Sequence, residues 1–398
     1  MNYRGIAYVM GTLLVVTGVA MLAPAVVATI YGEDDLAALL ISAVVSCAIG
    51  LPLRLGFSHG NVLDTRDAIA IAAFGWIIIS AVSTLPFILH GSIPSFTDAF
   101  FEMMSGYTTT GATILTDIEV VPHGLIFWRS ETHLLGGMGF LTLTIIFLPH
   151  GVAGLRIFRA ESSPGQVITR ERFTARNRDA ITYLWVIYLS LNLLQVILMC
   201  AGGMSLFDSL CHAFGTVSTS GYSPYNASIG HYQNAYFDWI IILFMFLGGV
   251  TFMLFYHAAR REWKVIRINT EFRWYLGFLL FFCSAATWLL WTDGTYGFVD
   301  SLRYGTFQVV SLLTTTGFTT TDYELWPQAA QMLLVVVCFV GACAGSTTSG
   351  IKIVHYVLIW RFLVGTVKRL FIQPLGGVQF RLNGRPVDPS IVQLAVCY

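Results

Sequence analysis

The stretch FTDAFFEMMSGYTTTGAT at residues 96–113 is a moderately apolar segment of about one short helix that ends in a hydroxyl-rich turn. Two later stretches repeat this pattern, LFDSLCHAFGTVSTSGYS at 206–223 and LRYGTFQVVSLLTTTGFT at 302–319. Each closes on two hydroxyl residues followed by a glycine, and these glycines are Gly111, Gly221 and Gly317. Such self-similarity indicates one structural unit that the chain uses repeatedly.

A short helix followed by such a turn is typical of a segment that enters a membrane and leaves on the same side. Lipid cannot satisfy the turn's N–H and C=O groups, so the backbone must be buried by protein or line a water-filled path. Turns gathered around an axis line a pore, in which inward-pointing carbonyl oxygens replace the hydration shell of a monovalent cation. Hydroxyl-glycine turns also let membrane helices pack closely, which is the alternative for any single copy. The repetition favours the pore.

The surrounding composition is that of a membrane protein. Of 398 residues, 56% are hydrophobic and 11% are charged, and the mean hydropathy is +0.70, which excludes an ordinary water-soluble domain. The formal net charge is zero, so charge favours neither a nucleic-acid partner nor an anionic substrate. Apolar runs that predict eight membrane spans lie at 6–30, 36–57, 67–90, 124–150, 180–203, 232–258, 273–292 and 326–363.

Charged residues alternate between the two sides of these spans. Residues 151–179 and 259–273 are rich in arginine, which predicts cytoplasmic loops and a cytoplasmic N-terminus. The segments that contain the repeated turns carry mostly acidic residues, such as Asp98 and Asp208, and are expected to face outward. Arg129, near the outer end of a predicted span, is interpreted as an interfacial anchor.

The last apolar run, 326–363, is far longer than one crossing requires and contains GACAGSTTSGIK at 341–352. This cluster of glycine and hydroxyl residues is expected to break the helix within the membrane. An ionisable residue inside a membrane is a candidate functional residue, and Lys352 beside a flexible loop below the third turn is a candidate to close a cation path. The alternative is a lysine that snorkels from an ordinary packing kink.

Enzyme motifs are missing from the sequence. It contains no HExxH, no Walker A sequence and no GxSxG elbow, and Glu131 with His133 has no second pair of metal ligands beside it. The seven cysteines lack C-x-x-C spacing, which disfavours a disulfide framework or a zinc site. The sequence therefore predicts neither an enzyme nor a bound cofactor.

The turns TTGAT at 109–113, TSGYS at 219–223 and TTGFT at 315–319 resemble those of the Trk/Ktr/HKT potassium transporters, and the TrkH type is the most similar. The resemblance implies an all-α polytopic membrane fold in which two N-terminal helices precede repeated span–pore helix–span units around a pseudo-fourfold pore. It implies a K⁺ filter of Thr109, Thr110, Gly111, Thr219, Ser220, Gly221, Thr315, Thr316 and Gly317. It implies a gate of Gly345, Ser346, Thr347, Thr348, Gly350 and Lys352.

The resemblance also divides the chain. It predicts two extra helices and a cytoplasmic loop at 1–66, a first unit with its basic loop at 67–179, a second unit at 180–272, a third unit with a broken second helix at 273–367, and the start of an incomplete fourth unit at 368–398. The family's fourth filter turn, and the basic residue that partners the gate, are then expected to be absent, so the chain is expected to stop before the last quarter of the pore.

For function, the resemblance implies potassium uptake across the bacterial inner membrane, driven by the membrane potential with or without coupling to protons, with K⁺ as the transported ion. It implies a homodimer regulated by a cytoplasmic nucleotide-binding subunit of the TrkA type. A glycine at position 111, where the family also uses serine, supports selectivity for potassium over sodium.

Three alternative functions are compatible with the sequence. The chain could be a secondary transporter with inverted repeats for another monovalent cation, which the common side of the three turns disfavours. It could be a membrane enzyme, which the scarcity of titratable groups in the spans disfavours. It could also be an inactive fragment that has only the family's fold.

Overall fold

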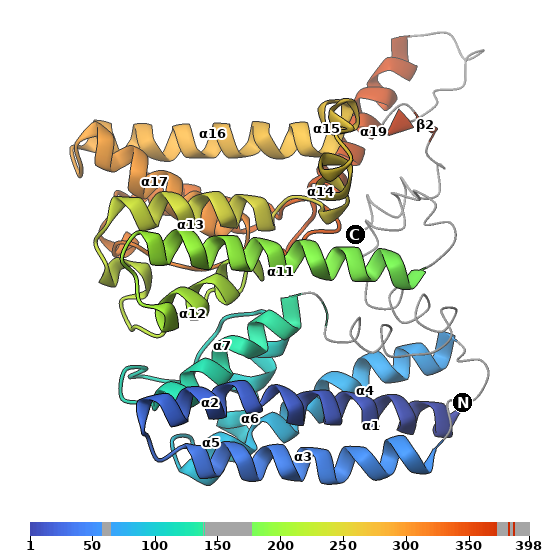
Figure 1. The fold of residues 1–398 in the computed structure, drawn as a ribbon. Coiled ribbons are helices and arrows are strands. Elements are labelled where there is room, and N and C mark those ends of the chain that lie inside the picture. The colour runs from blue at the N-terminus through green and yellow to red at the C-terminus, as the bar shows by residue number, and fades with distance from the viewer. Residues whose placement is uncertain (58–64, 138, 140–176, 372–380, 383–384, 387–398) are drawn as a thin grey trace. The chain divides into compact units, whose positions relative to one another are not determined.

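The structure is a computed structural model that describes residues 1–57, 65–137, 139, 177–371, 381–382 and 385–386. Most of these residues are helical (Figure 1), which confirms the predicted all-α fold; a small ladder pairs β1 (Arg381–Leu382) with β2 (Arg385–Pro386). The chain forms two compact units. The first holds the described residues of Met1–Glu161, Phe173–Phe244 and Thr316–Thr320, and the second those of Met245–Thr315 and Thr321–Tyr398.

Five helical segments of the described part are long and apolar enough to cross a membrane. They are Tyr3–Tyr31, Leu36–Gly56, Ile69–His90, Thr182–Ala201 and Thr270–Asp293. They confirm the spans predicted at 6–30, 36–57, 67–90, 180–203 and 273–292. The protein is therefore a multi-pass membrane protein.

In the first unit, the N-terminal helices α1 (Tyr3–Ala20) and α3 (Leu36–Gly56) pack closely because glycines face each other between them. A methyl group on Gly11 would lie 2.7 Å from the carbonyl oxygen of Gly50, and a methyl group on Gly50 would lie 2.8 Å from that of Gly11. Small residues at such contacts let membrane helices approach closely. The hydroxyl of Ser46 adds a hydrogen bond of 2.7 Å to the carbonyl of Leu14.

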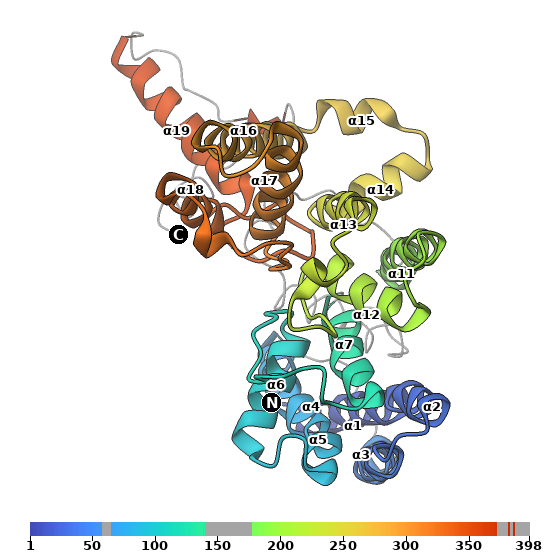
Figure 2. The ribbon, with the colours of Figure 1, turned by 90° about the vertical axis from the view of Figure 1, so that its left-hand side faces the viewer.

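The remaining helices of the first unit include two short ones, α6 and α12, which each have 12 residues and would be about 18 Å long. That length spans only part of a membrane about 30 Å thick. These helices are α2 (Leu22–Tyr31), α4 (Thr65–Ser83), α5 (Leu85–His90), α6 (Phe96–Tyr107), α7 (His123–Gly137), α11 (Asn177–Ala201), α12 (Leu206–Val217) and α13 (Ala235–Gly248), whose residues from Met245 on belong to the second unit (Figure 2). Buried side chains such as Met103, Trp128 and Phe214 form the core between them.

In the second unit, α16 (Thr270–Asp293) packs along the third short helix, α17 (Phe298–Leu313). Gly305 of α17 permits the contact, because a methyl group there would lie 3.2 Å from the backbone nitrogen of Thr287. The other helices of this unit are α14 (Phe252–Ala259), α15 (Trp263–Ile268), α18 (Gln328–Cys338) and α19 (Ile353–Phe371). Short 3-10 turns are present at Ser228–His231 in the first unit and Tyr323–Leu325 in the second.

Two predicted spans are interrupted. The break predicted within 326–363 is confirmed, because α18 ends at Cys338 and α19 begins at Ile353. The span predicted over 232–258 is bent, because α13 and α14 meet at an angle of 96° around Gly249. The mean hydropathy of the run does not reveal this bend; the local signal is Gly248, Gly249 and Thr251. Of the span predicted at 124–150 and the loop at 151–179, only 124–137, residue 139 and 177–179 are described.

Candidate functional site

The three hydroxyl-glycine turns share one backbone conformation. In each turn the threonine two positions before the glycine has a positive φ of 54° to 57°, and the glycine itself has a φ of 75° to 85°. The residues are Thr109 and Gly111, Thr219 and Gly221, and Thr315 and Gly317. Threonine rarely adopts a positive φ, at a cost of about 1–3 kcal/mol, and such strain is typically retained at ligand sites. Three unrelated kinks would not repeat this strained pattern.

A hydroxyl residue that sequence analysis did not select completes each turn. Thr108 Oγ1 donates to the carbonyl of Met104 at 2.7 Å, Thr314 Oγ1 donates to that of Val310 at 2.7 Å, and Ser218 Oγ donates in the same way to Phe214. Each of these carbonyls also accepts from the backbone nitrogen of the same residue, so the hydroxyl adds a second hydrogen bond at the C-terminal end of α6, α17 and α12. The signal was present, because a hydroxyl residue stands three positions before every one of the glycines.

The glycines also allow the turns of the first unit to touch. A methyl group on Gly111 would overlap the carbonyl oxygen of Ser220, and a methyl group on Gly221 would overlap the carbonyl oxygen of Thr316. The structure thus brings the first predicted filter turn against the second, and the second against the third. Carbonyl oxygens line these contacts, which is the chemistry that a dehydrated monovalent cation requires.

A buried ion pair lies behind the first turn. Glu102 of α6 and Arg129 of α7 are 0% and 1% exposed, and Arg129 Nε lies 2.6 Å from Glu102 Oε1. The Glu102 carboxylate also accepts from Thr113 Oγ1 at 3.0 Å and from the backbone nitrogen of Ile114 at 2.9 Å. It therefore holds the chain that leaves the first turn. The interpretation of Arg129 as an interfacial anchor is wrong, because its side chain points into the protein toward this carboxylate.

The same arginine reaches the second turn. Arg129 Nη1 donates to the carbonyl of Ser223 at 3.2 Å, and its guanidinium lies 3.4 Å from the ring centroid of Tyr222. The Tyr222 hydroxyl donates to the carbonyl of Glu102 at 2.9 Å, and the ring of His133 stacks on Tyr222 at 3.8 Å. The first two turns are thus fastened together on the side that follows their glycines.

In the second unit, the predicted gate loop packs against the bend between α13 and α14. The backbone nitrogen of Cys343 donates to Gly249 O at 3.1 Å, and the nitrogen of Phe252 donates to Gly345 O at 3.1 Å. Thr251 Oγ1 donates to Ala344 O at 2.7 Å. Two interruptions far apart in the sequence therefore satisfy each other's backbone groups, as a membrane interior demands.

The loop has the flexible residues and the lysine that the sequence indicated. Gly345 and Gly350 have φ values of 73° and 80°. Lys352 is 6% exposed, and its Nζ donates to both the carbonyl and the hydroxyl of Thr348 within the loop, the latter at 3.1 Å. Ser349 N donates to Thr315 Oγ1 at 2.9 Å, which joins the loop to the start of the third turn.

Glu271 is a further polar residue of this region that sequence analysis missed. It lies in the first turn of α16, it is 5% exposed, and its Oε1 accepts from the backbone nitrogen of Ala344 at 2.5 Å. An acidic residue at the start of an apolar span was the available signal, but its partner is 73 residues away in the sequence. Among the residues that the structure describes, no group of three or more metal-ligating side chains is present.

Comparison with known proteins matches this architecture to one family. A model of the TrkH family, described as a cation transport protein, matches residues 37–373. The Trk system potassium uptake protein TrkH of Halomonas elongata is 33% identical over 398 residues, covering 99% of this chain and 82% of that protein, and TrkH of Escherichia coli K12 is 32% identical with the same coverage. The crystal structure of the potassium transporter TrkH from Vibrio parahaemolyticus matches with a TM-score of 0.86 and 29% identity, covering 100% of this chain and 82% of that one. The chain therefore belongs to the TrkH family of cation transport proteins.

Proposed function

We propose that this protein takes up potassium ions across the bacterial inner membrane through a pore lined by the backbone carbonyls of its hydroxyl-glycine turns. The observation that carries the proposal is the repeated backbone: three turns with the same pair of positive φ values, preceded by the same hydroxyl cap. The relatives that match over almost the whole chain are Trk system potassium uptake proteins. Transport, rather than catalysis, accounts for both the repeated turns and the similarity to potassium uptake proteins.

The filter residues in this proposal are Thr109, Thr110 and Gly111, then Thr219, Ser220 and Gly221, then Thr315, Thr316 and Gly317. Alternation of positive and negative φ along each turn allows successive carbonyl oxygens to point to one side. Carbonyl dipoles balance the dehydration of K⁺ without a fixed charge, so the ion binds and still leaves. The Glu102–Arg129 pair supports the filter from behind, since it binds the chain just after Gly111 and Gly221.

The loop at 345–352 is proposed as the gate, with Gly345, Ser346, Thr347, Thr348, Gly350 and Lys352 as its residues. Its hydrogen bond to Thr315 supports a position against the third turn. Lys352 places a positive charge on the loop, and such a charge near a cation path opposes conduction. The glycines with positive φ supply the points at which the loop can rearrange.

The topology and the partners belong to the same proposal. The arginine-rich segment 259–273 supports a cytoplasmic side at the start of α16, and thus a cytoplasmic N-terminus. The relatives are named as members of a Trk system, and we propose a cytoplasmic regulatory subunit of the TrkA type on the resemblance to the family. We propose a homodimer as the assembly on the resemblance to the family.

Potassium-limited growth of a bacterial strain that lacks its own uptake systems tests the proposal. The strain expressing this protein should grow at potassium concentrations that do not support the empty strain, and it should accumulate Rb⁺. The Gly111→Ser variant should lose preference for K⁺ over Na⁺. Growth rescue with equal uptake of K⁺ and Na⁺ by both forms would contradict the filter, and absence of rescue by membrane-inserted protein would contradict uptake.

A further inference from the structure

A groove in the second unit lies outside the ion path described above. It has a volume of about 590 Å³ and is lined by Thr270, Arg273, Trp274, Gly277, Phe278, Phe281 and Arg361. Its wall is α16, and α19 packs beside it through the contacts Trp274–Trp360 at 6.4 Å and Phe278–Tyr356 at 5.8 Å between ring centroids. The groove therefore opens along the side of a membrane span.

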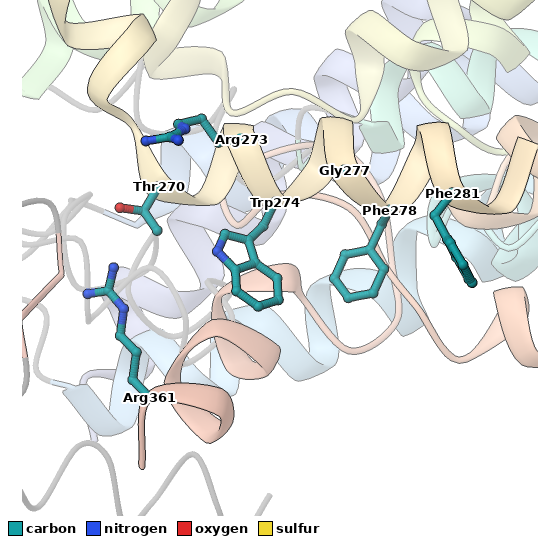
Figure 3. A pocket seen from close by; sticks show the side chains of 7 residues that line it. All are labelled: Thr270, Arg273, Trp274, Gly277, Phe278, Phe281 and Arg361. Atoms are coloured by element: carbon teal, nitrogen blue, oxygen red, sulfur yellow. The ribbon is translucent and has the colours of Figure 1, made fainter. Parts of the chain in front are cut away.

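The groove has a polar end and an apolar length. Figure 3 shows Thr270, Arg273 and Arg361 at one end, whereas the rings of Trp274, Phe278 and Phe281 follow one another along the same side of α16. The polar end is the start of α16, which follows the arginine-rich segment 259–273. By the positive-inside rule this end lies at the cytoplasmic surface.

The arginines are available to a ligand. In the part of the chain that the structure describes, neither Arg273 nor Arg361 forms an ion pair with an acidic side chain. The acidic residue nearest in sequence, Glu271, is buried and accepts a hydrogen bond from Ala344 in the gate loop. Two guanidinium groups and a threonine hydroxyl at the same end of the groove suit a phosphate, because guanidinium N–H groups match phosphate oxygens.

The length of the groove fits one leaflet. Thr270 and Phe281 are eleven positions apart on α16, which corresponds to about 16 Å along the helix axis. That is about half of the 30 Å hydrocarbon thickness of a membrane. Gly277 lines the groove, and a methyl group there would meet no atom within 4 Å. A side chain at this position would therefore extend into the groove, which glycine leaves open.

We propose that this groove binds an anionic phospholipid of the inner leaflet, with its phosphate at Arg273 and Arg361 and an acyl chain along Trp274, Phe278 and Phe281. Basic pockets between membrane helices on the cytoplasmic side are suited to such headgroups. A protein helix is a poorer occupant, because a fully apolar helix would leave both arginines without a counter-charge. The bound lipid would connect α16 to α19, the helix that continues from the gate loop.

Native mass spectrometry of the purified protein with added phosphatidylglycerol or phosphatidylcholine tests this site. Phosphatidylglycerol should bind at least about tenfold more tightly, because only its headgroup carries a net negative charge. The double variant Arg273→Gln/Arg361→Gln should lower its affinity about 30-fold, as expected for two arginines at a membrane surface. Lys264→Gln/Arg267→Gln is the matched control, since it removes the same charge from exposed positions of α15 outside the groove.

The variant Gly277→Leu tests the contribution of the apolar groove to lipid binding separately from that of the arginine charges. A leucine Cβ there would meet no atom within 4 Å, the longer side chain would occupy the groove, and leucine favours the helix over glycine, so the thermal unfolding temperature should be retained while phosphatidylglycerol affinity falls at least about tenfold. Equal binding of both lipids, an equal loss in the α15 control, or unchanged binding by Gly277→Leu would overturn the proposal. A groove covered by a protein segment would give the last of these results.

Discussion

Arg129 Nε lies 2.6 Å from Glu102 Oε1, and both side chains are buried. One end of this pair binds Ile114 after the first turn and the other binds Ser223 after the second. A buried charge without its partner is strongly unfavourable, whereas an intact pair contributes little net stability and mainly fixes geometry. The pair is therefore best understood as a positioning element for two adjacent filter turns.

Removal of one charge from this pair should destabilise the protein. Arg129→Met should lower the free energy of unfolding by about 3–5 kcal/mol, because Glu102 would remain buried and unpaired. Thermal unfolding of the purified protein in detergent measures this effect. The double variant Glu102→Gln/Arg129→Met should recover at least half of the lost stability. If the two single effects simply add in the double variant, the side chains do not act as a pair.

The same variants should separate stability from selectivity. Glu102→Gln/Arg129→Met should insert into the membrane and take up Rb⁺, yet discriminate less between K⁺ and Na⁺, because the first and second turns lose a common support. Competition of Na⁺ with Rb⁺ uptake measures this. If a stable double variant discriminates between K⁺ and Na⁺ as well as the parent does, the Glu102–Arg129 pair contributes to stability only and not to selectivity.

Alanine at the filter glycines should abolish uptake. Gly111→Ala and Gly221→Ala each force an L-residue into a positive φ and place a methyl group on the carbonyl oxygen of the neighbouring turn. The strain alone is about 1–2 kcal/mol, and the overlap displaces an oxygen proposed to bind the ion. Gly32→Ala is the matched control, since Gly32 has a φ of 69° and open space around it. It should lose similar backbone stability but retain Rb⁺ uptake; equal loss of uptake in both would contradict the filter.

Sequence reasoning located the turns because their composition is local. The three residues of each hydroxyl-glycine triplet are consecutive in the chain, so each copy of the repeat could be identified directly from the sequence. It did not reveal the positive φ of Thr109, Thr219 and Thr315, because threonine gives no sign that tertiary contacts will hold it in a strained conformation. It also could not pair Glu102 with Arg129, which lie 27 residues apart on different helices.

Hydropathy gave the spans but not their bends. The break before Lys352 was predictable because glycine and hydroxyl residues interrupt the apolar run. The bend between α13 and α14 was missed: Gly248, Gly249 and Thr251 were a shorter signal of the same kind, and the bend depends on hydrogen bonds to Cys343, Ala344 and Gly345. Long-range satisfaction of backbone groups decides such a bend, and a single sequence does not show it.

Two neighbouring aspartates in the loop before α3 should respond oppositely to pH. The hydrogen bond from the His90 ring, at 3.0 Å, lowers the pKa of Asp34, whereas burial raises the pKa of Asp35. The stabilisation from Asp34 is present above its ordinary pKa near 3.8 and is lost as the pH falls through the lower folded value. For Asp35 the folded state is favoured at low pH, and this contribution is lost as the pH rises through the raised value.

Unfolding temperatures of Asp34→Asn and Asp35→Asn between pH 3 and 7 check this contrast. Asp34→Asn should be less stable than the parent at pH 7, and the difference should shrink toward pH 3. Asp35→Asn should be most favourable relative to the parent at pH 7, because asparagine can still accept from the Leu125 nitrogen without burying a charge. Parallel pH profiles for the two variants would disagree with the assigned environments.

The hydrogen bond from Ser349 N to Thr315 Oγ1 is expected to hold the proposed gate loop against the third turn. Thr315→Val keeps the shape of the side chain but removes the acceptor, so the loop should lose about 1 kcal/mol of its attachment to the third turn. If the attached loop is the closed state, the ratio of open to closed protein should rise about fivefold. Thr315→Ser is the control, because it retains the hydroxyl at the same backbone position.

Rb⁺ flux into proteoliposomes without any regulatory subunit distinguishes the outcomes. Thr315→Val should raise the basal flux about fivefold, and Thr315→Ser should match the parent. Lys352→Met should raise it further, since the loop would lose both its charge and its bonds to Thr348. A fall in flux with Thr315→Val would mean that the attached loop belongs to the conducting state. Because K⁺ over Na⁺ preference depends on the carbonyls rather than on this hydroxyl, a gate effect should leave that preference unchanged, whereas damage to the filter would lower it.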